Sequence, residues 1–136
     1  MRPDVVTFDC AQTLVKVDWQ PAAIAVESAM RAGLTLDRQV AGELYARRLQ
    51  TMWPEFMHLN LRRDADVLAE FWLRLTQEWM QQAGLPVEKA SEVVGHANEI
   101  LFGDGSKVFV LYEDTVPCLE RLKRAGYRLA VVSNWD

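Results

Sequence analysis

The chain has 136 residues; half are hydrophobic and a quarter are charged, which is typical of one soluble globular domain, or one core with a small appendage. The net charge of -4 lacks the basic surplus of nucleic-acid-binding proteins. No stretch reaches the roughly 18 apolar residues that a membrane-spanning helix requires. We therefore expect neither nucleic acid nor a membrane as a partner.

The cysteines and the N-terminus indicate the compartment. Cys10 and Cys118 are the only cysteines, with no CxxC pair and no neighbouring histidine. Residues 1–4 lead directly into a strand and lack the apolar stretch of a signal peptide. Two free thiols without a disulfide framework are typical of a reducing compartment, so we expect a cytoplasmic protein.

The first predicted element is a strand at about 4–9. Val5, Val6 and Phe8 form a short apolar run there, which is typical of a strand covered on both faces of a parallel sheet. The run ends at Asp9, so the strand places an acidic side chain at its carboxyl end. In open α/β sheets, ligands and catalytic groups gather at this end.

The long middle of the chain, roughly 16–107, is predicted to form four helices. The first covers 21–32. The second begins after Asp37 as N-cap, and we expect Pro54 to kink or end it, because proline removes a backbone donor and clashes with the preceding turn. The apolar repeat of this second helix consists of Val40, Leu44, Leu49, Met52 and Trp53.

The other two helices of the middle segment are predicted at about 64–83 and 87–101. The third helix carries a strong amphipathic stripe, and Gly84 is placed to end it. A turn-like segment at 102–107 follows the fourth helix. The members of the stripe in the third helix are Leu68, Phe71, Trp72, Leu75 and Trp79.

The final third of the chain changes character. An extended segment at 108–112 precedes a helix at 115–125, for which Thr115 is the predicted cap, and a second strand follows at 127–132. This helix and strand complete a βαβ unit with the first strand. Its right-handed crossover places both strand tips at one edge of the sheet.

The two strand tips carry the candidate chemistry. Asp9 can act as a nucleophile, a metal ligand or a general base. We expect the backbone N–H groups of the turn at 10–13 to form a nest for anionic oxygens, joined by the Ser133 hydroxyl and the Asn134 amide. The alternative is that Asp9 merely caps a turn and the Ser-Asn pair merely ends a strand.

The motif Phe8-Asp9-x-x-x-Thr13-Leu14 resembles the first motif of the haloacid dehalogenase-like hydrolase superfamily. The segment 111–134, which ends in a Ser-Asn pair, is similar to the return of that family from its helical cap into its second motif. The helical insertion lies where the family places its cap. Together these features cover essentially the whole chain.

The resemblance implies an α/β fold with a partial Rossmann-like parallel sheet, made of two core strands and a crossover helix. The core would comprise 1–15 and 108–136, and the all-helical cap would comprise 16–107. The cap would close over a small phosphorylated or halogenated substrate and exclude water.

The resemblance also assigns roles to single residues. Asp9 would be the nucleophile, Thr13 would orient the turn, Ser133 would bind the transferring phosphoryl oxygen, and Asn134 would lie beside it. A phosphatase would hold Mg²⁺ through the Asp9 carboxylate and the carbonyl at position 11, whereas a dehalogenase would need no metal. The remaining expected substrate contacts are Ala11, Gln12 and Trp135.

Three departures from the family pattern shape the functional expectation. Ala11 stands where family phosphatases carry a second aspartate, whose acid–base help is typically worth about 100- to 10,000-fold. This favours dehalogenase-like chemistry, an unusual phosphatase or a catalytically weak member. Gln12 replaces the usual glycine and would be strained if the turn requires a positive φ. The later lysine and acidic motif of the family have no counterpart before Asp136.

We therefore expect a haloacid dehalogenase-like hydrolase that is inactive as this chain alone, because the later lysine and acidic motif are missing. Two strands and one helix also cannot cover a sheet. This predicts a fragment of a longer protein, or a short protein whose exposed sheet edges pair in a homo-oligomer. The alternative function is a catalytically degenerate binding or interaction module.

Overall fold

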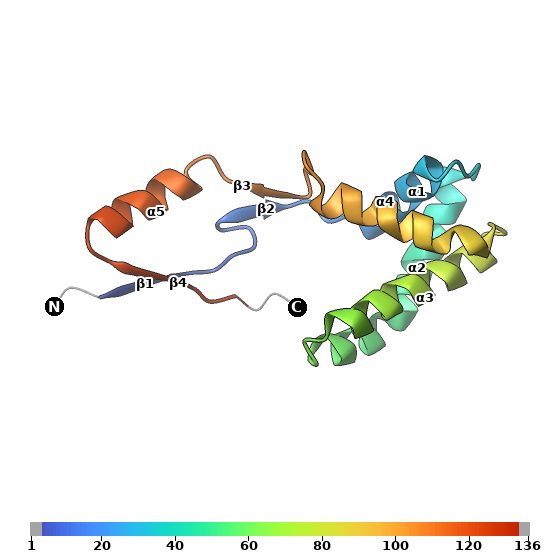
Figure 1. The fold of residues 1–136 in the computed structure, drawn as a ribbon, viewed down its shortest axis with the longest axis horizontal. Coiled ribbons are helices and arrows are strands. Elements are labelled where there is room, and N and C mark those ends of the chain that lie inside the picture. Colours follow the sequence, from blue (N-terminus) through green and yellow to red (C-terminus); the bar gives the residue numbers. More distant parts are fainter. Residues whose placement is uncertain (1–3, 134–136) are drawn as a thin grey trace. The chain divides into compact units, whose positions relative to one another are not determined.

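The structure is a computed structural model that describes residues 4–133, and the chain divides into two compact units (Figure 1). The first unit contains 4–19 and 105–133, and the second is Gln20–Asp104. The boundaries expected from the sequence, 15/16 and 107/108, lie four residues before and three residues after these, so the expected helical segment is longer at both ends. The second unit is entirely helical, and the first contains all the strands.

The first unit is an α/β arrangement of two small sheets. Strand β1 pairs with β4 in parallel, as the βαβ interpretation predicts, and β2 pairs with β3 in antiparallel orientation. Strand β2 was not expected from the sequence, because three residues are too few to show a period. The elements of this unit are β1 (Val5–Phe8), β2 (Val15–Val17), β3 (Phe109–Leu111), α5 (Thr115–Arg124) and β4 (Arg128–Val131).

Helix α5 differs from its prediction at its first residue. Asp114 occupies the N-cap position without a side-chain capping bond, and Thr115 is the first helical residue. The Thr115 hydroxyl instead donates to the Leu14 carbonyl at 2.8 Å. The threonine thus joins α5 to the segment that follows β1, rather than capping its own helix.

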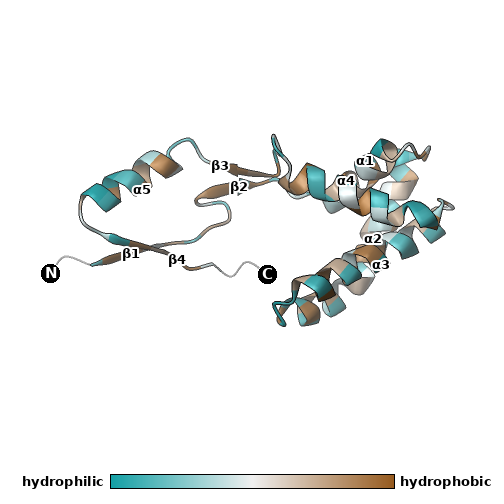
Figure 2. Ribbon diagram, viewed as in Figure 1, coloured by the Kyte–Doolittle hydropathy of each residue, from teal (hydrophilic) through white to brown (hydrophobic). Residues whose placement is uncertain are grey.

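The first unit has a small core. Among its described residues, only Val108 and Thr115 are buried. Figure 2 shows apolar residues along its strands, and many of them are solvent-exposed. The exposed large apolar side chains of this unit are Val5, Trp19, Val110, Leu111, Tyr112, Val116, Val131 and Val132.

The second unit holds the main hydrophobic core. Helices α1 and α4 pack together, as do α2 and α3. Asp37 caps α2 through the Val40 N–H, as predicted, and Asp64 caps α3 through two N–H groups. The elements are α1 (Pro21–Arg31), α2 (Arg38–Asn60), α3 (Ala65–Gln82), the 3₁₀ turn η1 (Val87–Lys89) and α4 (Ala90–Phe102).

We expected Pro54 to kink or end the second helix; it does not end it, because α2 continues through the proline to Asn60. The residues beyond the proline explain this. Phe56 is buried and packs against the rings of Phe71 and Trp72, with centroids 5.5 and 5.2 Å away. Burial of such an aromatic side chain outweighs the local cost of an interior proline.

The buried stripe of α2 matches the predicted one at Leu49 and Met52, but it lies one residue later in the first two turns. Val40 is 53% exposed, and the residue after it faces the core. The predicted stripe of α3 is confirmed at its centre, because Phe71, Leu75 and Trp79 are buried. The buried positions of α2 are Ala41, Tyr45, Leu49, Met52 and Phe56.

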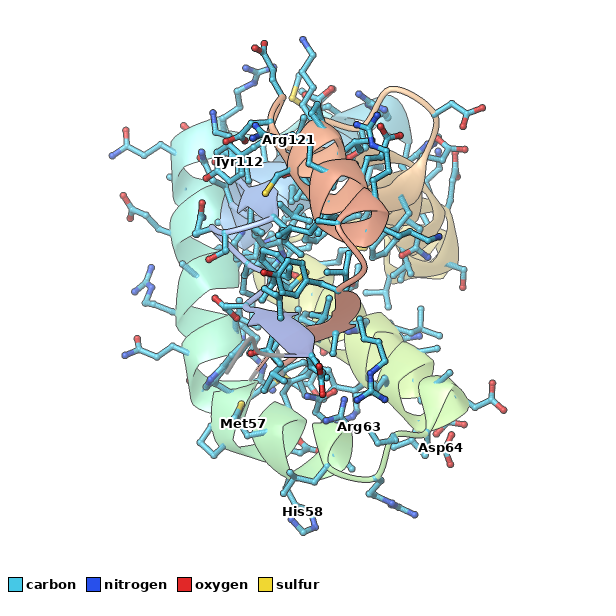
Figure 3. All side chains as sticks on the ribbon, turned by 90° about the vertical axis from the view of Figure 1, so that its left-hand side faces the viewer. Met57, His58, Arg63, Asp64, Tyr112 and Arg121 are labelled. Atoms are coloured by element: carbon cyan, nitrogen blue, oxygen red, sulfur yellow. The ribbon has the colours of Figure 1, made fainter. Side chains whose placement is uncertain are left out.

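Trp79 is the anchor between these two helices. It is 0% exposed, and its indole N–H donates to the Ala41 carbonyl at 2.9 Å. Its ring meets that of Tyr45 edge-on at 5.3 Å. At the other end of the hairpin, Figure 3 shows His58, Arg63 and Asp64 at the turn between α2 and α3. None of the helices within 4–133 has the length and apolar character needed to cross a bilayer.

Candidate functional site

Strands β1 and β4 end at the same edge of their parallel pair (Figure 1), and a polar residue lies within two positions of each strand end. Phe8 pairs with Val131, and the Val132 N–H donates to the Phe8 carbonyl at 2.8 Å. Asp9 comes directly after Phe8, and Ser133 comes directly after Val132. The backbone therefore brings Asp9 and Ser133 to one end of the sheet from opposite ends of the chain.

The turn after Asp9 is closed by backbone hydrogen bonds. The Cys10 carbonyl accepts the N–H groups of Thr13, Leu14 and Val15 at 3.2, 2.9 and 3.1 Å. The Gln12 N–H donates to the Val15 carbonyl at 2.7 Å. The segment is thus a tight, internally bonded turn that leads from β1 into β2.

This bonding limits the anion-binding nest expected at 10–13. The N–H groups of Gln12 and Thr13 are both used inside the turn, so they do not point at a bound anion. A buried or closed turn satisfies its own backbone donors wherever it can. Of the turn at 10–13, the N–H groups of Cys10 and Ala11 are left for an anionic oxygen, and Ser133 is a described hydroxyl residue at the same edge.

Gln12 adopts the left-handed backbone conformation, with a φ of 60°. The condition under which glutamine is strained at this position is therefore met, because a side chain disfavours this region by about 1 kcal/mol or more. Its amide has two partners: Nε2 donates to the Val17 carbonyl at 3.0 Å, and Oε1 accepts from the Tyr112 hydroxyl at 3.1 Å. The side chain thus links the turn to both strands of the second sheet.

The sequence analysis missed Tyr112 and Thr115 as residues of this region. Tyr112, labelled in Figure 3, follows β3, and its N–H donates to the Leu14 carbonyl at 3.2 Å. Thr115 is 4% exposed and donates to the same carbonyl. No local pattern reports these contacts, because each joins positions about a hundred residues apart in the sequence.

The predicted site residues differ in what the structure shows of them. Asp9, Gln12, Thr13 and Ser133 are exposed, and Ala11 is half-buried. Within residues 4–133, the Asp9 carboxylate accepts no side-chain or backbone hydrogen bond, which leaves it open to solvent. The other two predicted residues, Asn134 and Trp135, lie outside the described residues.

The donor set at this edge suits a hard cation only in part. No group of three or more histidine, cysteine, aspartate or glutamate side chains gathers in the described part of the chain. The Asp9 carboxylate and the Ala11 carbonyl are both oxygen ligands. Mg²⁺ is commonly bound by one or two carboxylates together with substrate phosphate and water, so these two groups fit that ion.

No family model and no curated protein matches this chain.

Proposed function

We propose that the protein is a haloacid dehalogenase-like hydrolase in which Asp9 is the nucleophile. The observation that carries this proposal is the parallel pairing of β1 with β4, which brings Asp9 and Ser133 to one sheet edge. An exposed carboxylate beside an uncharged donor suits attack on an electrophilic phosphorus or carbon atom. The first unit would then be part of a Rossmann-like core, and the helical unit would be its cap.

The reaction would proceed in two steps. An Asp9 oxygen bonds to the phosphorus of a phosphate ester, or to the carbon that bears a halogen, and the leaving group departs with its electron pair. Water then cleaves the covalent intermediate and restores the carboxylate. Ser133 would donate to the transferring oxygen, Thr13 would support the turn, and Asn134 and Trp135 would contact the substrate.

Mg²⁺ would neutralise the negative charge of a phosphorylated substrate. The Asp9 carboxylate and the Ala11 carbonyl would hold it, together with oxygens of the substrate and water. A halogenated substrate brings no phosphate charge, so the same residues would act without the ion. The cytoplasmic setting that we infer rests on the two free thiols, of which Cys118 is exposed.

Ala11 limits which leaving groups can depart from this site, because it cannot protonate them. Its methyl group cannot deliver a proton, and no other acidic side chain stands at that position. A halide or a weakly basic phenolate departs without a proton, whereas an alkoxide needs one. The best substrates are therefore small halogenated acids or aryl phosphates, and alkyl phosphates are poor ones.

A single-turnover experiment in heavy-oxygen water tests the nucleophile and separates the two chemistries. Hydrolysis of an ester between Asp9 and carbon occurs at the carboxyl carbon, which places a solvent oxygen on Asp9. Attack of water at phosphorus places the solvent oxygen in the released phosphate instead. Mass spectrometry of the peptide that contains Asp9 reads the first outcome, and mass spectrometry of the phosphate reads the second.

Two matched variants complete this test. Asp9→Asn removes the nucleophile and should abolish product formation. Asp4→Asn changes an exposed carboxylate just before the start of the same strand and should leave turnover intact. Turnover that survives in Asp9→Asn, or that is lost equally in both variants, would show that Asp9 is not the nucleophile.

One observation favours a second candidate, a binding module without catalysis. The inward bonding of the Gln12 and Thr13 N–H groups leaves fewer donors for a reacting oxygen than a catalytic turn usually offers. Such a module would bind a phosphorylated ligand without forming a covalent bond. Calorimetric titration of inorganic phosphate, with no mass change at Asp9 in the presence of a phosphate ester, would establish this alternative.

A further inference from the structure

Gln12 has a strained backbone conformation, and both polar atoms of its side-chain amide are hydrogen-bonded. At a φ of 60°, glycine would avoid the strain, so glutamine costs stability unless its side chain returns it. The side chain makes two hydrogen bonds, to the Val17 carbonyl and from the Tyr112 hydroxyl. These contacts give glutamine a function at this position that glycine cannot perform.

The two bonds fix the orientation of the amide. Only Nε2 can donate to the Val17 carbonyl, and only Oε1 can accept from Tyr112 while that bond is made. The reversed amide would place an oxygen against the carbonyl and lose the donor. Gln12 therefore holds one end of β2 and the residue after β3 at defined distances from the turn.

The same segment receives a second set of supports from Tyr112 and Thr115. Both donate to the Leu14 carbonyl, through a backbone N–H at 3.2 Å and a hydroxyl at 2.8 Å. The Thr115 N–H in turn donates to the Tyr112 carbonyl at 3.0 Å. The turn that follows Asp9 is thus hydrogen-bonded both to the start of α5 and to the second sheet.

We propose that Gln12 is a positioning residue, whose amide holds the turn after Asp9 against the β2–β3 sheet. The two hydrogen bonds that do so, to the Val17 carbonyl and from the Tyr112 hydroxyl, are called the clasp below. Gln12 acts without touching the substrate, which differs from the substrate contact expected for it from the sequence. The proposal rests on Asp9 being the nucleophile. A loosened turn shifts the Asp9 carboxylate away from its line of attack, and a small misplacement of reacting groups can cost about 100-fold in rate.

Three variants separate the side chain from the backbone conformation. Gln12→Ala removes the amide and keeps the strained φ, whereas Gln12→Gly removes the amide and relieves the strain. Tyr112→Phe removes one hydroxyl and leaves the ring. Lys16→Ala, an exposed position of β2, is the matched control, because its side chain takes no part in the clasp.

The readout is steady-state turnover measured against substrate concentration, which resolves kcat and KM, together with the rate at which the covalent intermediate forms at Asp9. We expect all three clasp variants to lower kcat by roughly 10- to 100-fold with KM unchanged. Gln12→Gly should be as slow as Gln12→Ala although it is better folded, which a merely structural role would not produce. Hydrogen exchange at 13–17 should be faster in the clasp variants than in Lys16→Ala.

The possible results distinguish this proposal from the proposed function. If the wild-type chain forms the intermediate and the clasp variants match its kcat, Gln12 is not a positioning residue and Asp9 remains the nucleophile. If Gln12→Gly regains the wild-type rate, the backbone strain and not the amide is what matters, and the clasp is refuted. If the wild-type chain forms no intermediate with either substrate class, the proposed function fails and the positioning role fails with it.

Discussion

Replacing Pro54 with alanine should stabilise the helical unit. Helix α2 runs unbroken from Arg38 to Asn60, so the proline lies in its interior. Proline has no N–H, and the Gln50 carbonyl four residues earlier therefore lacks its helical donor. The ring itself is exposed, so alanine gives up little packing.

The size of the gain follows from these terms. An interior proline costs about 3 kcal/mol relative to alanine, which is an upper limit because α2 has already adjusted to it. The recovered hydrogen bond contributes about 0.5–1.5 kcal/mol. Against this, alanine restores conformational entropy to the unfolded chain, which lowers the free energy of unfolding by about 0.4–1 kcal/mol. We expect the free energy of unfolding to rise by roughly 1–2 kcal/mol.

Urea unfolding measures this change, and the tryptophans of α2 and α3 supply the fluorescence signal. Pro54→Gly restores the N–H but should gain about 1 kcal/mol less than Pro54→Ala. Pro86→Ala is the control of opposite sign: this proline precedes η1 with a φ of -68°, so its loss should destabilise by about 0.4–1 kcal/mol. A neutral or destabilising Pro54→Ala would refute the reasoning, because it would mean that α2 is broken at the proline or that the ring is packed.

Three further predictions concern the core, a helix end and the site. Trp79→Phe removes an indole donor and some buried volume, so urea unfolding should show a loss of roughly 1–3 kcal/mol; no loss would mean that the indole bond to α2 is absent. In Gly103→Ala, the new Cβ would lie 2.5 Å from the Glu99 carbonyl oxygen and should destabilise by about 1–3 kcal/mol. Gly95→Ala, in the same helix but facing open space, should stabilise by about 0.8–1 kcal/mol, and thermal midpoints that move in the same direction would contradict this account. Ala11→Asp supplies the missing acid and should raise alkyl phosphate turnover by about 100- to 10,000-fold with little effect on an aryl phosphate; equal gains on both would rule out that role.

The helices were predictable wherever local signals agreed. Asp37 and Asp64 cap their helices through backbone N–H groups, and Gly33 and Gly84 follow α1 and α3 with a positive φ. These signals act within one turn, so the residues concerned are close in the sequence. Pro54 is the exception, because α2 continues past it to Phe56, whose ring packs against two aromatic rings of α3.

The site was predictable only in its positions and not in its bonding. The order strand, helix, strand and the right-handed crossover rule predict that the tips of the first and last strands lie together. The observed β1–β4 register has both tips at one edge. The direction of the N–H groups of Gln12 and Thr13 depends on how the turn closes, and no pattern of residue types reports this. The bond from Tyr112 to Gln12 joins residues that have no sequence relation to each other.

The sequence by itself determined the alternation of strand and helix, the helix ends and the acidic residue at a strand tip, because these depend on period, caps and turns over a few residues. Only the tertiary structure decided that α2 runs through Pro54, that β2 exists, and that Gln12 accepts a strained backbone to bond with Val17 and Tyr112. Each of these features depends on free energy from partners distant in the chain. Local propensities of about 1 kcal/mol give way when burial and long-range hydrogen bonds favour another conformation.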